Sequence, residues 1–595
     1  MSAYSDLRPQ EMSKVRIHSE FWKNKITVNH KSTIAACIRN CENTERINNF
    51  KRAAGTMEGG FQGYYFDDSD VYKVLEGIAY TLAVEPDPEL EKKADQWIDL
   101  ICSAQQEDGY LVCYFILGTN GETRWTDMER HEDYCLGHMI EAAIAYKHAV
   151  GKDRFYRTAV RFADHFCDQV GEGKKNWVPG HQEIELALVK LYHESGDAKY
   201  LRQAQWLLEQ RGKGHGRGTN IWENWGADYA QDHMPVSEMR DITGHAVRAM
   251  YMYAGMCGVV KETGNAQYLR SLDNLWKSVV QRNMYLTGGI GSTRENEGFT
   301  EDYDLPNDTA YCESCASIGM IIWNQRMNDL YGEAKYADVV ERELYNGAIS
   351  GVSLDGTKFF YVNPLESDGN HHRVEWYGCS CCPTQISRFI PSIGQYIYSV
   401  GSDGIYINQY IASETEVTVG ETKVRVLQET RYPWDNVCDI RISTKEGGSF
   451  LLNLRIPELC GRYRVFINGE AYEEPFAENG YMKLLRDWEG ETGIRLVFDM
   501  PVRFVRAHPF VVQDRGRLAV MRGPVVYCAE QADNETGLDE IAISPDMEAA
   551  LVKSGLGIDN IVLRDGDRQY TFLPYFAWDN RQPGKMKVWI RQKHG

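Results

Sequence analysis

HEDYCLGHMIEAAIAYKHAVG, residues 131–151, keeps apolar residues at the spacing of an α-helix and ends in a basic turn and a glycine, a normal helix stop. A second helix is predicted directly after it, over Phe155 to Val170. Further pairs of the same kind are predicted at 70–84 with 90–106, 182–195 with 199–210, 244–260 with 266–282, and 314–330 with 333–348. Repeated helix pairs indicate either an open solenoid or a closed toroid.

Polar side chains recur near the start of one helix in each pair, and they favour the closed form. They are His138, His181, His245 and the pair Glu313 and Cys315. In a closed ring of helix pairs these ends converge on one pocket, whereas in an open solenoid they would line a groove. We therefore expect an N-terminal (α/α)6 barrel.

The composition changes near residue 400, where short alternating runs broken by Gly, Asp and Ser predict antiparallel strands. Such runs lie at 405–410, 416–419, 423–426, 462–467 before the Asn468-Gly469 turn, 493–498 and 586–590. We expect an α+β multidomain chain: the barrel over 6–400, a β-sandwich over 401–502 and a second β-sandwich over 503–595, with residues 1–5 as a candidate extra segment of the last domain. Because no low-complexity linker separates these parts, they should pack firmly together.

The composition excludes some classes of partner. The chain has 595 residues and a net charge of −20, which disfavours nucleic acid and anionic membranes as partners. No apolar run approaches the length of a membrane span, and MSAYSDLRPQEMSKV at the N-terminus has no apolar core after a basic start. Fifteen cysteines, an odd number, fit a reducing compartment. We expect a cytoplasmic protein that binds a small or neutral molecule, and a homodimer is among the expected assemblies.

Three cysteines lie within four residues in WYGCSCCP, residues 376–383. Pro383 is favoured at the first position of a helix, and apolar residues at helical spacing predict that helix over Thr384 to Val400. Cys381 and Cys382 would then lie at its positive end, which favours a thiolate. Both a nucleophile and a zinc ligand need that state.

Partners for these thiols are predicted in DTAYCESCAS, residues 308–317. Residues two apart do not share a helix face, so Glu313 and Cys315 can bind one ion only from a loop or a first turn. A carboxylate with two or three thiolates suits zinc better than calcium or magnesium. The alternative is a set of unrelated buried cysteines.

A glycine-rich loop lies just upstream, in TGGIGSTRENEGF, residues 287–299. Its Glu297 is followed by Glu301, Asp302 and Asp304, and crowded carboxylates raise one another's pKa, as a general acid near neutral pH requires. The alternative is an acidic loop that is only solvated.

These motifs together resemble glycoside hydrolase family 127, the β-L-arabinofuranosidases, over nearly the whole chain. The matching motifs are GxGSxRxxExF at 289–299, ESCAS at 313–317, NPL at 363–365 and CSCCP at 379–383. The resemblance implies a zinc ion held by Glu313, Cys315, Cys381 and Cys382. It further implies that Cys381 is the nucleophile and Glu297 the acid/base.

Weaker candidates follow from the same resemblance. His138, His181, His245 and Tyr361 are expected to bind the sugar, where the alternative for each histidine is a helix cap or a core group. Glu341 is expected either to support the site or to be an exposed helical residue. Trp125, Trp222 and Trp225 would stack on sugar rings or belong to the core.

We therefore expect a retaining exo-glycosidase that releases terminal β-linked L-arabinofuranose from a short oligosaccharide or glycoside, with a thiolate in place of the usual carboxylate nucleophile. Two alternatives stay open. One is a hydrolase for another pentose or an acidic sugar, or a sugar epimerase, on the same toroid. The other is a non-catalytic carbohydrate-binding protein with a structural zinc, against which Glu297 on its glycine loop argues.

Overall fold

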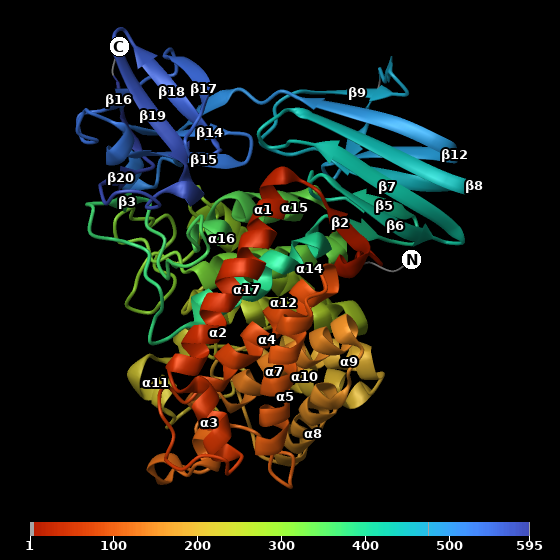
Figure 1. Ribbon diagram of the computed structural model, residues 1–595, viewed down its shortest axis with the longest axis vertical. Coiled ribbons are helices and arrows are strands. Elements are labelled where there is room, and N and C mark those ends of the chain that lie inside the picture. The colour runs from red at the N-terminus through yellow and green to blue at the C-terminus, as the bar shows by residue number, and fades with distance from the viewer. Residues whose placement is uncertain (1–4, 474, 594–595) are drawn as a thin grey trace.

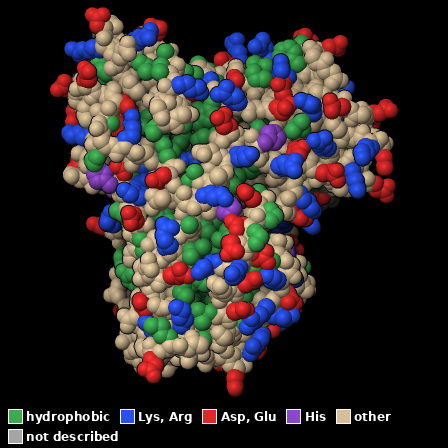
Figure 2. All heavy atoms as spheres, in the orientation of Figure 1, with side chains coloured by type: hydrophobic (Ala, Val, Ile, Leu, Met, Phe, Trp, Pro, Cys, Tyr) green, Lys and Arg blue, Asp and Glu red, His purple; other side chains and the backbone are tan. Residues whose placement is uncertain are grey.

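The computed structural model describes residues 5–473 and 475–593 (Figure 1). A helical region forms the lower part of the molecule in Figure 1, and two separate sheets lie above it. One large hydrophobic core includes residues of the helices and of both sheets. Figure 2 shows acidic and basic side chains interspersed over one face of the molecule. Among the described helices, none combines the length and the apolar character that a membrane crossing requires.

Six helices contact one another in cyclic order, and the last returns to the first. They are α4 (Asp68–Val84), α7 (Glu132–Val150), α9 (Ile184–Ser195), α12 (Ala246–Thr263), α14 (Ser314–Tyr331) and α17 (Cys381–Phe389). Most of their residues are buried on every side, which fits a position inside the helical region. Six helix ends therefore meet at each of the two open ends of the ring.

A second set of helices packs outside this ring, each against its inner partner. They are α2 (Ile34–Asn43), α5 (Pro88–Ala104), α8 (Arg154–Gln169), α10 (Ala198–Gln210), α13 (Ala266–Ser278) and α15 (Ala334–Tyr345). In α8 the buried residues include Phe155, Ala159, Phe162 and Phe166, one face of a helix. Shorter helices occupy the connections: α1 (Glu20–Val28), α3 (Arg46–Ala53), α6 (Cys113–Ile116), α11 (Asn220–Asn224) and α16 (Gly347–Ser350).

All five predicted helix pairs are confirmed, but the helix after the cysteine cluster differs from the prediction. Helix α17 begins at Cys381, so Pro383 is its third residue and not its first. The helix also ends at Phe389 rather than Val400. Pro391 lacks an N–H and disfavours helical backbone in the residue before it, and the chain continues as a 3-10 turn and strand β4 (Tyr398–Val400).

The first sheet has eleven strands among the described residues and is built around a long antiparallel pair, β8 (Val437–Arg455) and β12 (Tyr481–Phe498). Its other strands are β1 (Arg8–Pro9), β2 (Val15–Ile17), β4, β5 (Gly404–Ile407), β6 (Ser413–Val419), β7 (Thr422–Thr430), β9 (Tyr463–Ile467), β10 (Glu470–Ala471) and β11 (Ala477–Glu478). The predicted strands of this region are confirmed. The N-terminal strands β1 and β2 pair with β4 and β6, so the start of the chain belongs to this sheet.

The second sheet collects the C-terminal strands. They are β13 (Val502–Val505), β14 (Arg517–Arg522), β15 (Val525–Glu530), β16 (Ala542–Ile543), β17 (Glu548–Lys553), β18 (Asp559–Asp565), β19 (Arg568–Pro574), β20 (Met586–Lys587) and β21 (Ile590–Gln592). The strand predicted over 586–590 is divided between β20 and β21. A short strand from the helical region, β3 (Glu366–Ser367), pairs with β20. The expected extra segment, residues 1–5, lies outside the described residues except for Ser5, whose N–H donates to the carbonyl of Leu330.

The parts are joined by buried polar contacts, which confirms the expected firm packing. Arg455 of β8 is fully buried and pairs with Asp338 at 2.6 Å and with Glu341, both in α15. Both readings of Glu341 are therefore wrong: it is buried rather than exposed, and it holds the first sheet rather than the candidate site. On the other side, the hydroxyl of Tyr575 donates to the carbonyls of Asn363 and Pro364 at 3.0 and 2.9 Å.

Candidate metal centre and active site

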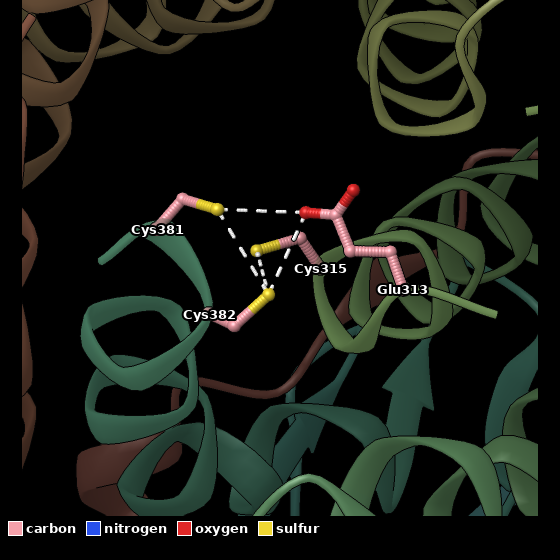
Figure 3. Close-up of side chains that lie close together, drawn as sticks. All are labelled: Glu313, Cys315, Cys381 and Cys382. Carbon is pink, nitrogen blue, oxygen red and sulfur yellow. Dashed lines mark hydrogen bonds between the residues drawn. The ribbon is translucent and has the colours of Figure 1, made fainter. Parts of the chain in front are cut away.

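Four potential metal ligands meet where two ring helices begin (Figure 3). Glu313 is the residue before α14 and Cys315 is its second residue, while Cys381 and Cys382 are the first two residues of α17. Helix starts have free N–H groups and a positive dipole end, which favour anionic side chains. The loop or first turn that the Glu-x-Cys spacing requires is therefore present.

The distances within this group match the edges of a ligand tetrahedron. Sγ of Cys382 lies 3.4 Å from Sγ of Cys315 and 3.9 Å from Sγ of Cys381. Oε1 of Glu313 lies 3.5 Å from the sulfurs of both Cys381 and Cys382. Around a tetrahedral zinc ion, sulfur pairs would be about 3.8 Å apart and a sulfur–oxygen pair about 3.5 Å apart. The sulfurs are too distant for disulfides, and every cysteine in the chain is free.

Burial and charge indicate that this group could hold a cation. Glu313, Cys315 and Cys382 are buried, and only Cys381 is half-buried. Oε2 of Glu313 is buried and has no hydrogen-bond partner among the described residues. Burial, followed by the charges of Cys381 and Glu297, raises the pKa of Glu313 well above its usual range. A divalent cation bound by these atoms would offset both effects, so the residues fit a metal site.

Asn363 of the NPL motif holds the loop that carries Glu313. Its Nδ2 donates to the carbonyl of Cys312 at 2.9 Å and to Oγ of Ser314 at 3.0 Å, while its Oδ1 accepts from Ser350 at 2.8 Å. Cys312 has a φ of +37°, a backbone conformation that needs such support. Asn363 thus fixes the residues on both sides of Glu313.

Glu297 lies beside the same group and accepts three hydrogen bonds. Tyr311 donates to Oε2 at 3.1 Å, Tyr229 donates to Oε1 at 3.3 Å, and Nε2 of His245 lies 3.3 Å from Oε2. Ligand atoms of His245, Glu297 and Glu313 also lie within 4.8 Å of one another. Glu313 therefore neighbours both Cys381 and Glu297.

The expected effect on the pKa of Glu297 is wrong. Burial acts to raise this pKa, but the hydrogen bond and charge of His245 outweigh it, and together with Arg248 and Tyr311 they lower the pKa to about 2. The acidic residues downstream do not crowd it: Asp302 pairs with Arg282 at 2.7 Å, and Asp304 accepts from Thr300 at 2.7 Å. The protein without substrate therefore holds Glu297 as a carboxylate.

The glycine loop is attached to the start of α12 by its backbone. The N–H of Ala246 donates to the carbonyl of Glu297 at 3.1 Å, and the N–H of Phe299 donates to the carbonyl of Gly244 at 3.1 Å. A Cβ on Gly298 would lie 1.8 Å from that carbonyl oxygen of Gly244, so only glycine fits. Glu297 itself has a φ of +52°. This attachment places Glu297 beside His245.

The three predicted histidines lie close together, with Tyr134 between two of them. The Tyr134 ring lies 4.4 Å from the rings of both His138 and His181, and His181 lies 5.6 Å from His245. Burial lowers the pKa of all three histidines, so they are neutral near pH 7. Neither ring nitrogen of His138 has a hydrogen-bond partner among the described residues.

His245 is a helix cap, which was the alternative to sugar binding. Its Nδ1 accepts from the backbone N–H groups of Val247 and Arg248 at 3.1 and 3.4 Å, which makes it the N-cap of α12. Because Nδ1 is an acceptor, the proton of the neutral ring lies on Nε2, the nitrogen that faces Glu297.

Tyr361 lies at the thiol predicted to be the nucleophile. Its hydroxyl is 3.2 Å from Sγ of Cys381 and 3.9 Å from Sγ of Cys379. Cys379, the third cysteine of the motif, lies 3.9 Å from Cys381 but outside the four-ligand group.

Sequence reasoning missed several residues of the site, chiefly Tyr229, Tyr311 and Lys73. Lys73 is buried in α4, with Nζ 3.8 Å from Asp70 and 5.2 Å from the centre of the Tyr134 ring. Burial acts to lower its pKa, but Asp70, Cys381 and Cys315 outweigh burial and raise it. A lone lysine in an otherwise apolar stretch of α4 was the available signal.

The three tryptophans have different environments. Trp125 is buried and donates to His165 at 3.1 Å, so its core alternative is confirmed. Trp222 donates to Asp232 at 3.1 Å. Trp225 is 45% exposed and stacks on Tyr229 with ring centres 4.7 Å apart, next to a donor of Glu297.

Comparisons with known proteins agree along the whole chain. Three family models match: the β-L-arabinofuranosidase GH127 catalytic domain at residues 14–395, the β-L-arabinofuranosidase GH127 middle domain at 404–500, and the glycoside hydrolase family 127 C-terminal domain at 502–591. The chain is 38% identical to a non-reducing end β-L-arabinofuranosidase of Bifidobacterium longum subsp. longum, over 92% of each protein.

Two solved structures are similar throughout. One is a GH127 β-L-arabinofuranosidase from Geobacillus stearothermophilus T6, with a TM-score of 0.93 and 40% identity over 97% of this chain and 100% of that one. The other is a GH127 β-arabinofuranosidase, with a TM-score of 0.92 and 39% identity over 100% of this chain and 99% of that one. The protein is therefore a glycoside hydrolase. Its chain belongs to glycoside hydrolase family 127.

Proposed function

We propose that the protein is a retaining exo-glycosidase that removes terminal β-linked L-arabinofuranose, with Cys381 as nucleophile and Glu297 as acid/base. The observation that carries this proposal is that Cys381, the one half-buried member of the four-ligand group, and Glu297 both neighbour Glu313. A purely structural metal site would not need an accessible thiol or a carboxylate held next to it. The activities named for the relatives support the choice of sugar.

The metal in this proposal is zinc, held by Glu313, Cys315, Cys381 and Cys382. Three soft thiolates and one carboxylate favour zinc over calcium or magnesium. When bound, zinc would keep these thiols deprotonated at neutral pH.

In the first step, Sγ of Cys381 attacks the anomeric carbon, a C–S bond forms and the glycosidic C–O bond breaks. Glu297 gives a proton to the departing oxygen. Because the substrate-free site holds Glu297 as a carboxylate, that proton is taken up before or together with substrate binding. Tyr361, whose hydroxyl lies 3.2 Å from Sγ, orients the thiolate.

In the second step, the carboxylate of Glu297 accepts a proton from water, and the water oxygen displaces Cys381 from the same carbon. Two displacements retain the anomeric configuration. Three hydrogen bonds stabilise Glu297 in the form that this step needs. His138, His181 and His245, neutral and close together, would bind the hydroxyls of the sugar.

We also propose the finer architecture: the two concentric sets of helices form an (α/α)6 barrel within 6–400, apart from β1, β2 and β4, which belong to the first sheet, and the sheets form β-sandwiches over 401–502 and 503–595. The cyclic helix contacts support the first part. Fifteen free thiols support a reducing, cytoplasmic location.

The test combines nitrophenyl glycosides of several pentoses with two cysteine variants. Wild-type protein should hydrolyse the β-L-arabinofuranoside fastest and carry about one zinc per chain. Cys381→Ser should lose turnover by several orders of magnitude, because a serine hydroxyl is much harder to ionise than a thiol. Cys379→Ser is the matched control and should keep most of the activity. Near-normal turnover in Cys381→Ser would show that a different group carries the displacement.

A further inference from the structure

A cavity lies inside the helix ring, and its wall includes residues that follow the candidate metal ligands along α14 and α17. It has a volume of about 660 Å³, within the range of small-molecule sites, and all six ring helices contribute to its wall. The metal ligands come from the first residues of α14 and α17, whereas the cavity is lined by later residues of the same helices, such as Gln325 and Phe389. The wall begins at Ile318 and Gln385, each three residues and about 4.5 Å along the helix from Cys315 or Cys382, and extends to Gln325, about 15 Å beyond Cys315. None of the candidate catalytic or metal-binding residues lines this cavity.

Two buried polar side chains in the wall each have one unused hydrogen-bonding atom. Glu141 is 6% exposed; its Oε2 accepts from Lys190 at 2.6 Å, and its Oε1 has no partner among the described residues. Gln385 is 1% exposed; its Oε1 accepts from Nε of Arg388 at 2.7 Å, and its Nε2 has no partner among the described residues. Both residues line the cavity, and these two atoms, one acceptor and one donor, have no partner among the described residues. An alcohol can satisfy both kinds of group, since a hydroxyl donates one hydrogen bond and accepts others.

Some charges of the wall are paired inside the protein. Arg388 pairs with Glu76 at 2.6 Å, and Lys190 pairs with Glu141 at 2.6 Å. Arg326 forms no ion pair with a described carboxylate and donates to the carbonyl of Ile322 at 3.1 Å, which leaves further N–H donors. Among the described residues, the wall holds five Lys and Arg side chains (Arg8, Lys190, Lys261, Arg326 and Arg388) and four Asp and Glu side chains (Glu76, Glu141, Glu262 and Asp329), so its charge is close to balance and does not single out an anion.

Aromatic side chains complete the wall: Tyr80, Tyr192, Phe389 and Tyr396. Aromatic faces offer apolar surface to the C–H groups of a sugar ring, while the polar atoms bind its hydroxyls. The cavity also reaches the exposed residues Arg8, His193 and Glu262, so a ligand can enter from solvent.

We propose that this cavity binds a small neutral saccharide of one or two rings, at a site separate from the metal centre. The proposal depends on Glu141, Gln385 and the shape of the cavity, and it does not depend on which glycoside the protein hydrolyses.

Gln385→Glu tests the free donor. It keeps an oxygen to accept from Arg388 but replaces the free NH2 with a second acceptor. Calorimetric titrations would use three neutral probes, L-arabinose, D-galactose and maltose, with the zinc-loaded Cys381→Ser protein as background, so that turnover does not contribute. At least one probe should bind the background protein, and Gln385→Glu should weaken this binding about tenfold or more, the loss expected for one hydrogen bond.

A second pair of variants tests the same site independently, in case Gln385→Glu does not fold. Ile322→Trp, at a half-buried position of the wall, should fill the cavity and abolish the same binding, while Ile322→Val should keep it. A crystal soaked with the bound probe should show a hydroxyl within hydrogen-bond distance of Oε1 of Glu141 and Nε2 of Gln385. Zinc content and hydrolysis by the otherwise wild-type enzyme should not change in Ile322→Trp.

Three outcomes would overturn the proposal. The cavity could hold only water in crystals saturated with each probe. Sugar binding could be equally strong in Gln385→Glu and Ile322→Trp, which would place it at the metal centre alone. Galacturonate could bind in the cavity where the neutral sugars do not, which would make the ligand an anion. None of these results bears on hydrolysis at Cys381, so the proposed function is judged separately.

Discussion

At the residue scale, the carboxylate of Glu313 lies beside both the proposed nucleophile, Cys381, and the proposed acid/base, Glu297. Glu313 lies 3.5 Å from Sγ of Cys381 and belongs to a second close group with His245 and Glu297. The four candidate metal ligands carry negative charge when deprotonated, and the charges of two of them, Cys381 and Cys315, help to raise the pKa of the buried Lys73. The site therefore concentrates negative charge, and Glu297 keeps its own charge because His245, Arg248 and Tyr311 lower its pKa.

Removing one of these three groups should shift the pH dependence of hydrolysis. Tyr311→Phe deletes the hydroxyl 3.1 Å from Glu297, and the loss of a hydrogen bond to the charged form raises the pKa of Glu297. A higher pKa keeps the acid form populated at higher pH. For a glycoside with a poor leaving group, the fall of kcat/KM with rising pH should therefore move upward by about one pH unit.

Two controls make this shift specific. Tyr285→Phe removes a buried hydroxyl that donates to Pro306 at 3.0 Å, and it should leave the pH profile unchanged. An activated aryl glycoside needs no proton on its leaving group, so its profile should not shift in Tyr311→Phe. An unchanged profile on the poor leaving group as well would mean that Glu297 is not the acid.

Sequence reasoning found the residues that belong to short local motifs: adjacent cysteines, Glu-x-Cys and a glutamate in a glycine-rich loop. The residues that it missed reach the site from elsewhere. Tyr229 lies 68 positions before Glu297, and nothing in its own neighbourhood marks it. The lowered pKa of Glu297 could not be predicted either, because it depends on donors from three separate segments.

At the element scale, the starts of ring helices α12, α14 and α17 supply the site, and each start is fixed by a different device. His245 caps α12, Asn363 supports the residues around Glu313, and α17 begins with its two metal ligands. Helix periodicity predicted the helix pairs well because the hydrophobic spacing is local. The early end of α17 follows from Pro391, which the apolar spacing does not take into account. The place of α17 as the sixth ring helix depends on contacts with α2 and α4, which the spacing does not encode.

The attachment of the glycine loop to α12 predicts a strong effect of one methyl group. In Gly298→Ala the new Cβ would meet the carbonyl oxygen of Gly244, so the loop must move and carry Glu297 with it. A displacement on the order of 1 Å should lower kcat roughly a hundredfold on poor leaving groups. Because the metal ligands lie on other elements, zinc content should stay at the wild-type level.

Gly461→Ala is the matched control for this variant. Nothing lies within 4 Å of the Cβ that it adds, and its φ is not in the left-handed region. Activity and zinc content should both be normal. If Gly298→Ala also kept normal activity, the position of the loop would not control the acid/base.

At the scale of the whole molecule, charged residues are buried where the helical region meets the sheets. Arg455 is paired with Asp338 and Glu341 in α15. Lys25 in α1 is 5% exposed, and its Nζ has no hydrogen-bond partner among the described residues; the nearest ring, Phe576 before the last strands, is 5.3 Å away. Composition showed that such charges exist, but only the packing of distant segments shows that Lys25 is buried without a partner.

Lys25 should therefore make folding depend on pH. Burial, followed by repulsion from Arg373, lowers its pKa from 10.5 to about 7. Between these values the unfolded chain binds a proton at this position and the folded chain does not, so the stability contribution of Lys25 rises with pH. Below pH 7 Lys25 is charged in both states, and burying its ammonium group lowers the free energy of unfolding by its full amount, on the order of a few kcal/mol.

Lys25→Met removes that cost while keeping a side chain of similar length in the apolar surroundings of Phe21 and Phe576. The midpoint of thermal unfolding should rise at pH 6, and the gain should shrink as the pH rises towards 10.5. Above pH 10.5 wild-type Lys25 is neutral in both the folded and the unfolded state. Lys23→Met, an exposed position in the same helix, is the matched control and should change little at either pH. A gain of equal size at both pH values would show that Met stabilises by packing alone, and a loss at pH 6 would show that the ammonium group of Lys25 has a favourable partner in the folded protein.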